Sequence, residues 1–290
     1  MGPLGPDGFH QIDTVFHAVD LYDDLSAVAA GSLSLSVCGP LGTDLAADSR
    51  NLAWRAAELL ASHAGVRAGA ELRLDKHIPV AAGLAGGSAD AAAALLACDR
   101  LWNLATPAAE LAALAARLGS DVAFGLLGGC AVGTGRGQRL RPIGTGQQFS
   151  WVLAAAGGQL STPMVYAELD RRRRGSGTAP APPAAPEHSG LMQALASGDP
   201  RLLAPQLSND LQPAAIALAP YLADTLTAGR DAGALAGIVS GSGPTCAFLA
   251  HDRDHADELA RTLAAGGSCR QAFAVLGGSA TPTVEIEWRT

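Results

Sequence analysis

The chain has 290 residues, of which 48% are hydrophobic and only 4% aromatic, so its core is expected to rest on alanine, leucine and valine. Its net charge of −7 excludes the basic surface that nucleic-acid-binding domains usually carry. Five cysteines without a C-x-x-C pair, and the lack of an 18-residue apolar run or a signal-peptide pattern, favour a cytoplasmic protein over a secreted or membrane protein.

The first half of the chain alternates between strand-like segments and alanine-rich helices. After a turn-rich start at residues 1–8, strands are expected over residues 9–24, 33–37 and 71–75. Helices are expected over residues 51–64, 90–102 and 107–118. Ser88 is a suitable N-cap for the second helix, Pro107 suits the first position of the third, and Gly119 suits its end.

The second half contains apolar strands, a helical region interrupted by prolines, and one loop-like stretch. Strands are expected over residues 130–134, 151–156, 270–276 and 283–288, a strand–turn–strand unit over 237–250, and helices over 191–230 and 251–265. A G-R-G-Q hairpin turn follows the first of these strands. Residues 171–190 begin with four arginines and continue with Gly, Ser and Pro, which favours a flexible loop over a phosphate-binding site. We expect two lobes, 1–150 and 151–290.

The most informative stretch is the glycine loop, which we define as residues 79–89, P-V-A-A-G-L-A-G-G-S-A. Its small residues let backbone approach a ligand, and the free amides and positive dipole of the helix that follows suit a phosphate group. The loop has neither the G-K-[ST] of a Walker A motif nor the G-x-G-x-x-G spacing of a dinucleotide site. A surface turn of small residues is the alternative, but the long helix after it favours a phosphate site.

Two further features can belong to the same site. The second glycine turn, residues 241–244, is a hairpin turn when considered alone, but it can also press against the glycine loop. Asp121 follows the end of a helix and precedes an apolar segment. It is either a cap or turn aspartate, or a carboxylate that accepts a proton from a substrate hydroxyl during phosphoryl transfer.

Four segments resemble one known family. P-V-A-A-G-L-A-G-G-S-A-D resembles the second motif of the GHMP kinases, and G-S-G-P-T-C-A-F resembles their third motif. P-D-G-F-H-Q-I-D-T-V-F and L-G-S-D-V-A-F are similar to the members, actinobacterial forms above all, that phosphorylate 4-diphosphocytidyl-2-C-methyl-D-erythritol. The resemblance covers nearly the whole chain. It implies a two-lobed α+β or α/β fold, with a ribosomal-protein-S5-like N-terminal lobe, a ferredoxin-like C-terminal lobe and the active site between them.

The same resemblance implies roles for individual residues, with ATP and Mg²⁺ as cofactors and Asp121 as the catalytic base. Phe9 and His10 correspond to a Tyr-His pair that contacts a cytosine, and Tyr166 corresponds to the aromatic residue on the other face of that base. The implied substrate-binding residues are Phe9, His10, Lys76, Thr162 and Tyr166. The implied ATP-binding residues are Pro79, Val80, Ala81, Ala82, Gly83, Leu84, Ala85, Gly86, Gly87, Ser88 and Ala89. No metal ligand is assigned.

The implied reaction is phosphorylation of the substrate's 2-hydroxyl in non-mevalonate isopentenyl diphosphate synthesis, by a cytoplasmic monomer or homodimer. One alternative is a GHMP kinase for another small alcohol, such as homoserine. The other is a nucleotide-binding module impaired in catalysis, because the family's lysine-bearing first motif, P-[AG]-K-x-N-L, is not found before D-G-F-H. We therefore expect Met1 to be an internal position of the natural protein, and the 290-residue form to be poorly stable and nearly inactive.

Overall fold

Three sheets form the framework of the part of the chain that the structure describes. The computed structural model describes residues 1–2, 4–5, 8–42, 45–67, 69–175, 189–278 and 282–284. The first sheet has the order β2-β4-β3 and contains β2 (Asp24–Ala29), β4 (Ala70–Asp75) and β3 (Ser34–Cys38). β3 runs parallel to β4 and β2 runs antiparallel to it. The strands predicted at 33–37 and 71–75 are thereby confirmed.

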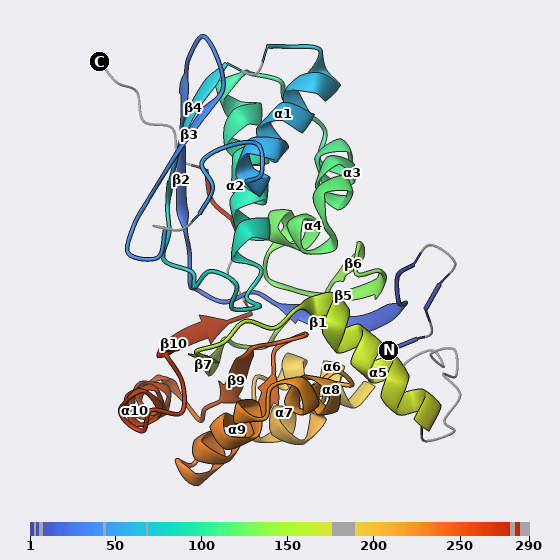
Figure 1. The fold of residues 1–290 in the computed structure, drawn as a ribbon, viewed down its shortest axis with the longest axis vertical. Coiled ribbons are helices and arrows are strands. Elements are labelled where there is room, and N and C mark those ends of the chain that lie inside the picture. The colour runs from blue at the N-terminus through green and yellow to red at the C-terminus, as the bar shows by residue number, and fades with distance from the viewer. Residues whose placement is uncertain are drawn as a thin grey trace.

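The second sheet is antiparallel, with the order β1-β5-β6, and lies in the middle of the molecule (Figure 1). It contains β1 (Ile12–His17), β5 (Cys130–Gly135) and β6 (Arg139–Pro142), so the predicted hairpin is confirmed. The single strand predicted over residues 9–24 is wrong, because β1 ends at His17 and β2 begins at Asp24. Between them the chain leaves β5 and makes an isolated antiparallel bridge from Val19 to Gly277, with Asp20 bonded to Leu276, so the pairing changes partner and the strand does not continue.

The third sheet has the order β10-β7-β9-β8 and is antiparallel throughout. It contains β7 (Phe149–Ala155), β8 (Ala236–Val239), β9 (Thr245–Leu249) and β10 (Gln271–Gly277), which confirms the strands predicted at 151–156, 237–250 and 270–276. Every residue of β7 is buried, as expected for an apolar strand in the centre of a sheet. The strand predicted at 283–288 lies largely outside the described residues, and 282–284 form no strand.

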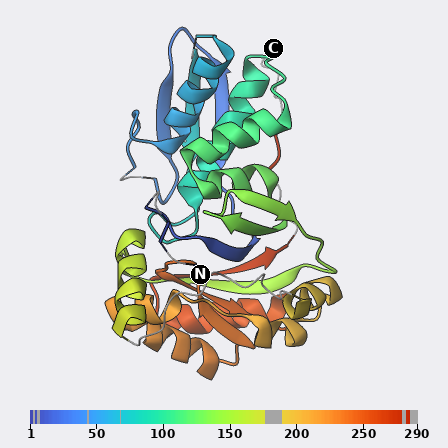
Figure 2. The ribbon, with the colours of Figure 1, turned by 90° about the vertical axis from the view of Figure 1, so that its right-hand side faces the viewer.

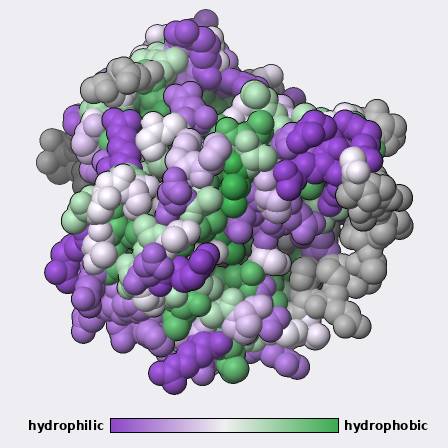
Figure 3. All heavy atoms as spheres, turned by 60° about the horizontal axis from the view of Figure 1, so that its bottom comes forward, coloured by the Kyte–Doolittle hydropathy of each residue, from purple (hydrophilic) through white to green (hydrophobic). Residues whose placement is uncertain are grey.

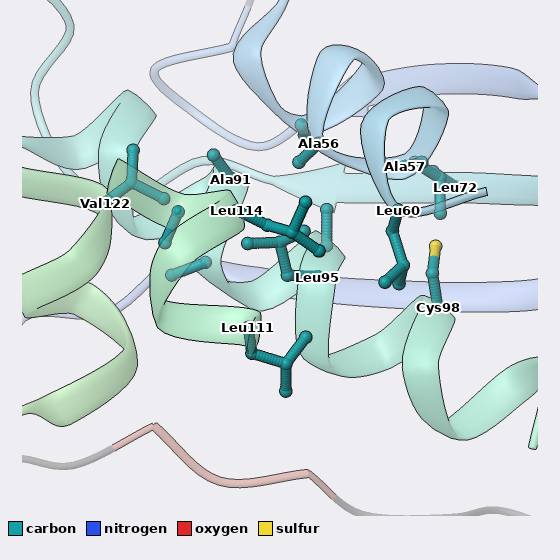
Figure 4. Close-up of a cluster of buried hydrophobic side chains, with 14 of the residues drawn as sticks. Ala56, Ala57, Leu60, Leu72, Ala91, Leu95, Cys98, Leu111, Leu114 and Val122 are labelled. Atoms are coloured by element: carbon teal, nitrogen blue, oxygen red, sulfur yellow. The ribbon is translucent and has the colours of Figure 1, made fainter. Parts of the chain in front are cut away.

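Four helices and the first sheet share an alanine- and leucine-rich core, as the composition predicted (Figure 4). They are α1 (Leu52–Ala64), α2 (Gly86–Leu101), α3 (Ala108–Leu118) and α4 (Ser120–Leu127). Two of the predicted caps are wrong. Helix α2 begins before Ser88, with Ala85 as its N-cap, and Pro107 is the N-cap of α3 rather than its first residue. Gly119 ends α3, as predicted.

The remaining helices lie with the third sheet in the lower half of Figure 1, and Figure 2 shows the orange ones below that sheet and the yellow-green α5 beside it. They are α5 (Thr162–Gly175), α6 (Ser189–Ser197), α7 (Pro200–Leu203), the short 3-10 helix η1 (Ala204–Gln206), α8 (Gln212–Leu218), α9 (Tyr221–Asp231) and α10 (Arg253–Ala265). Figure 3, in which the bottom of the molecule comes forward, shows hydrophilic residues over much of the surface and a narrow hydrophobic band near its centre.

The arginine run does not lie in a loop, which corrects the prediction for residues 171–190. All four arginines belong to α5, and the last three lie in its last turn, where cations interact favourably with the helix dipole. Arg171 also pairs with Glu168 one turn earlier, at 2.6 Å. Ser189 and Gly190 already belong to α6, and residues 176–188 lie outside the described part of the chain.

Candidate active site

The glycine loop connects the end of β4 to the start of α2 through an unusual backbone. Ala81 and Ala85 have positive φ angles of 57° and 55°, which residues other than glycine seldom adopt. Such strained positions concentrate at functional sites. Ala85 is the N-cap of α2 and makes no side-chain capping bond, so the first amides of the helix are left for a ligand.

The second glycine turn touches the glycine loop, as the sequence suggested. The hydroxyl of Thr245 donates a buried hydrogen bond of 2.7 Å to the Ala82 carbonyl oxygen. A Cβ atom on Gly83 would lie 2.2 Å from the Gly243 carbonyl oxygen, so only glycine permits this approach of the two backbones. The Thr162 and Ser242 hydroxyls form a hydrogen bond of 2.8 Å, which ties the start of α5 to the same turn.

Asp121 lies in the first turn of α4, close to the proposed site. The N-cap of this helix is Gly119, and no side chain caps it, so the alternative of a capping aspartate has no support. Asp121 is exposed to solvent on one side, but desolvation by the surrounding protein raises the pKa of its carboxyl above the ordinary value. A raised pKa makes a carboxylate a better proton acceptor near neutral pH.

The structure brings His10 and Tyr166 together although 155 positions separate them in the sequence. Their ring centroids lie 5.1 Å apart. His10 is buried, and its Nε2 and Nδ1 atoms lie 3.1 Å from Asp170 Oδ2 and 3.0 Å from the Gly2 carbonyl oxygen. Burial, and then the negative charge of Asp121, raise the pKa of the Tyr166 hydroxyl, so the predicted base is within electrostatic reach of this pair.

Phe9 differs from its neighbour His10 in that its side chain is largely exposed, at 54%. The Arg136 guanidinium lies 4.7 Å from the Phe9 ring centroid and covers one face of the ring. Arg136 belongs to the turn between β5 and β6, where its carbonyl oxygen accepts a hydrogen bond of 2.7 Å from the Ser120 hydroxyl. The sequence identified this G-R-G-Q segment only as a turn, and nothing local indicated that it would reach Phe9.

Asn209 is a second residue whose role the sequence did not indicate. Its Nδ2 atom donates hydrogen bonds of 2.8 Å and 2.7 Å to the carbonyl oxygens of Val239 and Gly241. Its Oδ1 atom accepts a bond of 2.9 Å from the Leu211 amide. Asn209 therefore fixes the entry to the second glycine turn.

Lys76 does not lie with the other predicted substrate-binding residues. Its side chain is only 2% exposed and lies beneath the glycine loop, between Asp23 and Asp90.

The described part of the chain holds no group of three or more His, Cys, Asp or Glu side chains suited to a metal ion. None of the described helices has the length and apolar character needed to cross a membrane.

The chain is also similar to known proteins over most of its length. Residues 51–129 match the GHMP kinases N terminal domain, and residues 191–269 match the GHMP kinases C terminal domain. The 4-diphosphocytidyl-2-C-methyl-D-erythritol kinase of Streptomyces avermitilis is 53% identical over 94% of this chain and 90% of its own. The enzyme of the same name from Nocardia farcinica is 53% identical over 93% of this chain and 87% of its own.

Solved structures give the same result. A crystal structure of 4-(cytidine 5'-diphospho)-2C-methyl-D-erythritol kinase superimposes with a TM-score of 0.77 and 34% identity, covering 96% of this chain and 94% of that one. Homoserine kinase from Cytophaga hutchinsonii superimposes with a TM-score of 0.68 at 18% identity, over 93% of this chain and 94% of that one. The second likeness concerns the fold alone.

Proposed function

The chain belongs to the GHMP kinase family, and from this membership we propose that it transfers the γ-phosphoryl group of ATP to the 2-hydroxyl of 4-diphosphocytidyl-2-C-methyl-D-erythritol. We choose this substrate because two kinases named after it are 53% identical to this protein over more than nine tenths of the chain. The close pair of His10 and Tyr166 supports it, because an aromatic ring and a polar ring edge suit a cytosine. The reaction would serve isopentenyl diphosphate synthesis by the non-mevalonate route.

The glycine loop would hold the phosphates of ATP through its backbone amides. The uncapped start of α2 offers N–H donors and a positive dipole end, both of which favour an anion. Mg²⁺, when bound with ATP, would offset the negative charge of the phosphates. Contact with the second glycine turn keeps the loop in one conformation, so its amides need no rearrangement when the nucleotide binds.

Asp121 would act on the attacking hydroxyl. Its carboxylate accepts the hydroxyl proton while the oxygen forms a bond to the γ-phosphorus, and the bond from that phosphorus to the bridging oxygen breaks to release ADP. Because the pKa of this carboxyl is raised, the proton transfer is less unfavourable than to an ordinary aspartate.

Phe9 and Tyr166 would flank the cytosine, and the His10 ring, whose two nitrogens are held by Asp170 and by the Gly2 carbonyl oxygen, would pack beside it. The Asp170 carboxylate next to His10 Nε2 fixes the orientation of the imidazole. The Arg136 guanidinium covers one face of the Phe9 ring, so it would stand next to the base. Thr162, bonded to Ser242, would line the side of the pocket next to the second glycine turn.

The direct test is an assay of ADP release with purified protein, ATP and Mg²⁺, in which the cytidylyl substrate and homoserine are compared. We expect turnover with the cytidylyl substrate and none above background with homoserine. Turnover with homoserine alone would indicate another GHMP kinase. ATP binding without turnover of either alcohol would indicate a module impaired in catalysis.

We also propose that the protein is a cytoplasmic monomer or homodimer. The reducing cytoplasm suits its five unpaired cysteines.

A further inference from the structure

Lys76 is a buried cation held between two buried carboxylates. Its Nζ atom donates a hydrogen bond of 2.9 Å to Asp90 Oδ2 and another to Asp23 Oδ2. The side chains of all three residues are 2% to 3% exposed. Removing three charges from water carries a large desolvation penalty, which is offset only by close pairing and hydrogen bonding of this kind.

The two carboxylates lie at opposite ends of the glycine loop. Asp23 comes from the connection between β1 and β2, and its Oδ1 atom accepts hydrogen bonds of 2.6 Å and 2.9 Å from the amides of His77 and Ile78. It therefore holds the backbone that enters the loop. Asp90 lies in α2, the helix that leaves the loop. The Lys76 ammonium thus links the entry of the loop to its exit.

The ammonium also lies directly beneath the first residue of α2. A Cβ atom on Gly86 would lie 3.4 Å from Lys76 Nζ and 2.9 Å from Ile78 Cγ2. The start of the helix therefore rests on the segment that Asp23 holds. Any shift of Lys76 or Asp90 would move the amides that face the nucleotide.

We propose that Asp23, Lys76 and Asp90 form a positioning triad that fixes both ends of the glycine loop and thereby sets the affinity for ATP. Lys76 acts through the loop and does not contact the nucleotide. One cation faces two carboxylates, so it has no excess positive charge to offer a phosphate. This inference rests on the proposed function, because it takes the glycine loop to be the ATP site.

The titration of Asp90 agrees with this arrangement. Burial raises the pKa of its carboxyl to about 7, in spite of the opposing effect of Lys76. Its Oδ1 atom is buried and has no hydrogen-bond partner among the described residues. Keeping this buried carboxylate ionised costs free energy of folding. Its contact with Lys76 therefore serves the loop rather than the stability of the fold.

The test is the affinity of a non-hydrolysable ATP analogue, measured by titration without any alcohol substrate, for Asp90→Leu and Asp90→Asn. Leucine breaks the link between Lys76 and α2, so we expect affinity to fall about tenfold, equivalent to about 1.4 kcal/mol. Asparagine keeps an oxygen acceptor for Lys76, so affinity should stay within about twofold of the wild type. Direct contact of Lys76 with phosphate predicts the opposite sign for Asp90→Leu, because removing a carboxylate frees the cation.

The matched control is Asp99→Asn, a buried aspartate in the same helix that accepts a bond of 3.0 Å from the Thr106 amide and lies far from the loop. It should lose stability without a change in affinity. Should Asp90→Leu fail to fold, Asp90→Ala gives the same test with a smaller side chain, because it also removes the carboxylate and keeps Lys76. Unchanged or increased affinity in a folded variant overturns the triad. Failure of the wild type to phosphorylate the cytidylyl substrate would instead overturn the proposed function alone.

Discussion

The Thr245 hydroxyl donates a hydrogen bond to the Ala82 carbonyl oxygen across 163 positions of sequence. Both groups are buried, and the bond joins β9 to the middle of the glycine loop. A buried carbonyl that loses its donor keeps the full cost of its desolvation. The conformation of the glycine loop therefore depends on the third sheet as well as on the strand and helix that flank the loop.

Thr245→Val should remove this bond with little change in shape. We expect a loss of about 1–3 kcal/mol in the free energy of unfolding, together with weaker ATP binding. Denaturant unfolding and ATP titration measure the two effects. Thr225→Val is the control, because Thr225 is also buried but bonds to Ser268 and Tyr221, away from the loop. Equal ATP affinity in both variants would show that the loop does not depend on Thr245.

Gly86→Val should weaken ATP binding by distorting the start of α2. The added Cβ atom would lie 2.9 Å from Ile78 Cγ2, closer than real side chains approach, so the loop must shift. ATP titration of the folded variant measures the effect. Gly144→Ala is the control, because a Cβ atom there meets nothing within 4 Å. Wild-type affinity in Gly86→Val would remove the glycine loop from the nucleotide site.

Asp121→Asn should lower kcat by roughly a hundredfold or more, as expected when a general base is lost. ATP affinity should change little, because the proposed role concerns the alcohol and not the nucleotide. Asp254→Asn, which also changes an exposed aspartate in the first turn of a helix, should leave kcat unaffected. Nearly intact turnover in Asp121→Asn would require a different base.

The raised pKa of Asp121 predicts where the activity of the enzyme falls on the acid side of its pH profile. Only the ionised carboxylate accepts a proton, so activity should fall as the pH drops through the pKa of Asp121. Burial raises that pKa above 3.8, so the wild-type limb should lie above the ordinary aspartate value. An acid limb at the ordinary value in the wild type would contradict the burial effect.

Tyr166→Ala should weaken binding of the cytidylyl substrate. Stacking of a base on an aromatic ring contributes about 1–3 kcal/mol, so the KM for this substrate should rise roughly five- to hundredfold. The KM for ATP should stay close to the wild-type value. Tyr221→Ala, which removes a partly exposed tyrosine from α9, should change neither constant. An unaffected KM for the cytidylyl substrate would favour a natural substrate that is an alcohol without a nucleobase.

Asp90 should make the stability of the protein depend on pH. Its pKa is raised from 3.8 to about 7 in the folded state, so the folded protein holds a proton that the unfolded chain has released over this range. Stability from this group is therefore complete below about pH 4 and is lost as the pH rises through about 7. Unfolding curves from pH 4 to 8 should show this decline in the wild type and in Asp99→Asn, but not in Asp90→Asn.

Much of the local structure and the main site motifs could be predicted from the sequence, because short-range patterns carry them. Alternating residues identified β3 and β4, and apolar periodicity identified α1 and α3. The small residues of the glycine loop indicated a close backbone approach, and the loop proved to lie against Gly243. A close approach of two backbones requires residues with small side chains at the position itself, so the sequence indicates where such an approach is possible.

Only the tertiary structure decided which distant groups meet. The sequence placed Lys76 among the substrate-binding residues, but the approach of Asp23 and Asp90 buries it beneath the glycine loop. The sequence likewise assigned Arg136 to a turn, and the packing of that turn against α4 brings its guanidinium over Phe9. Burial and charge pairing depend on distances between elements that no local pattern encodes, because the packing of helices and sheets sets those distances.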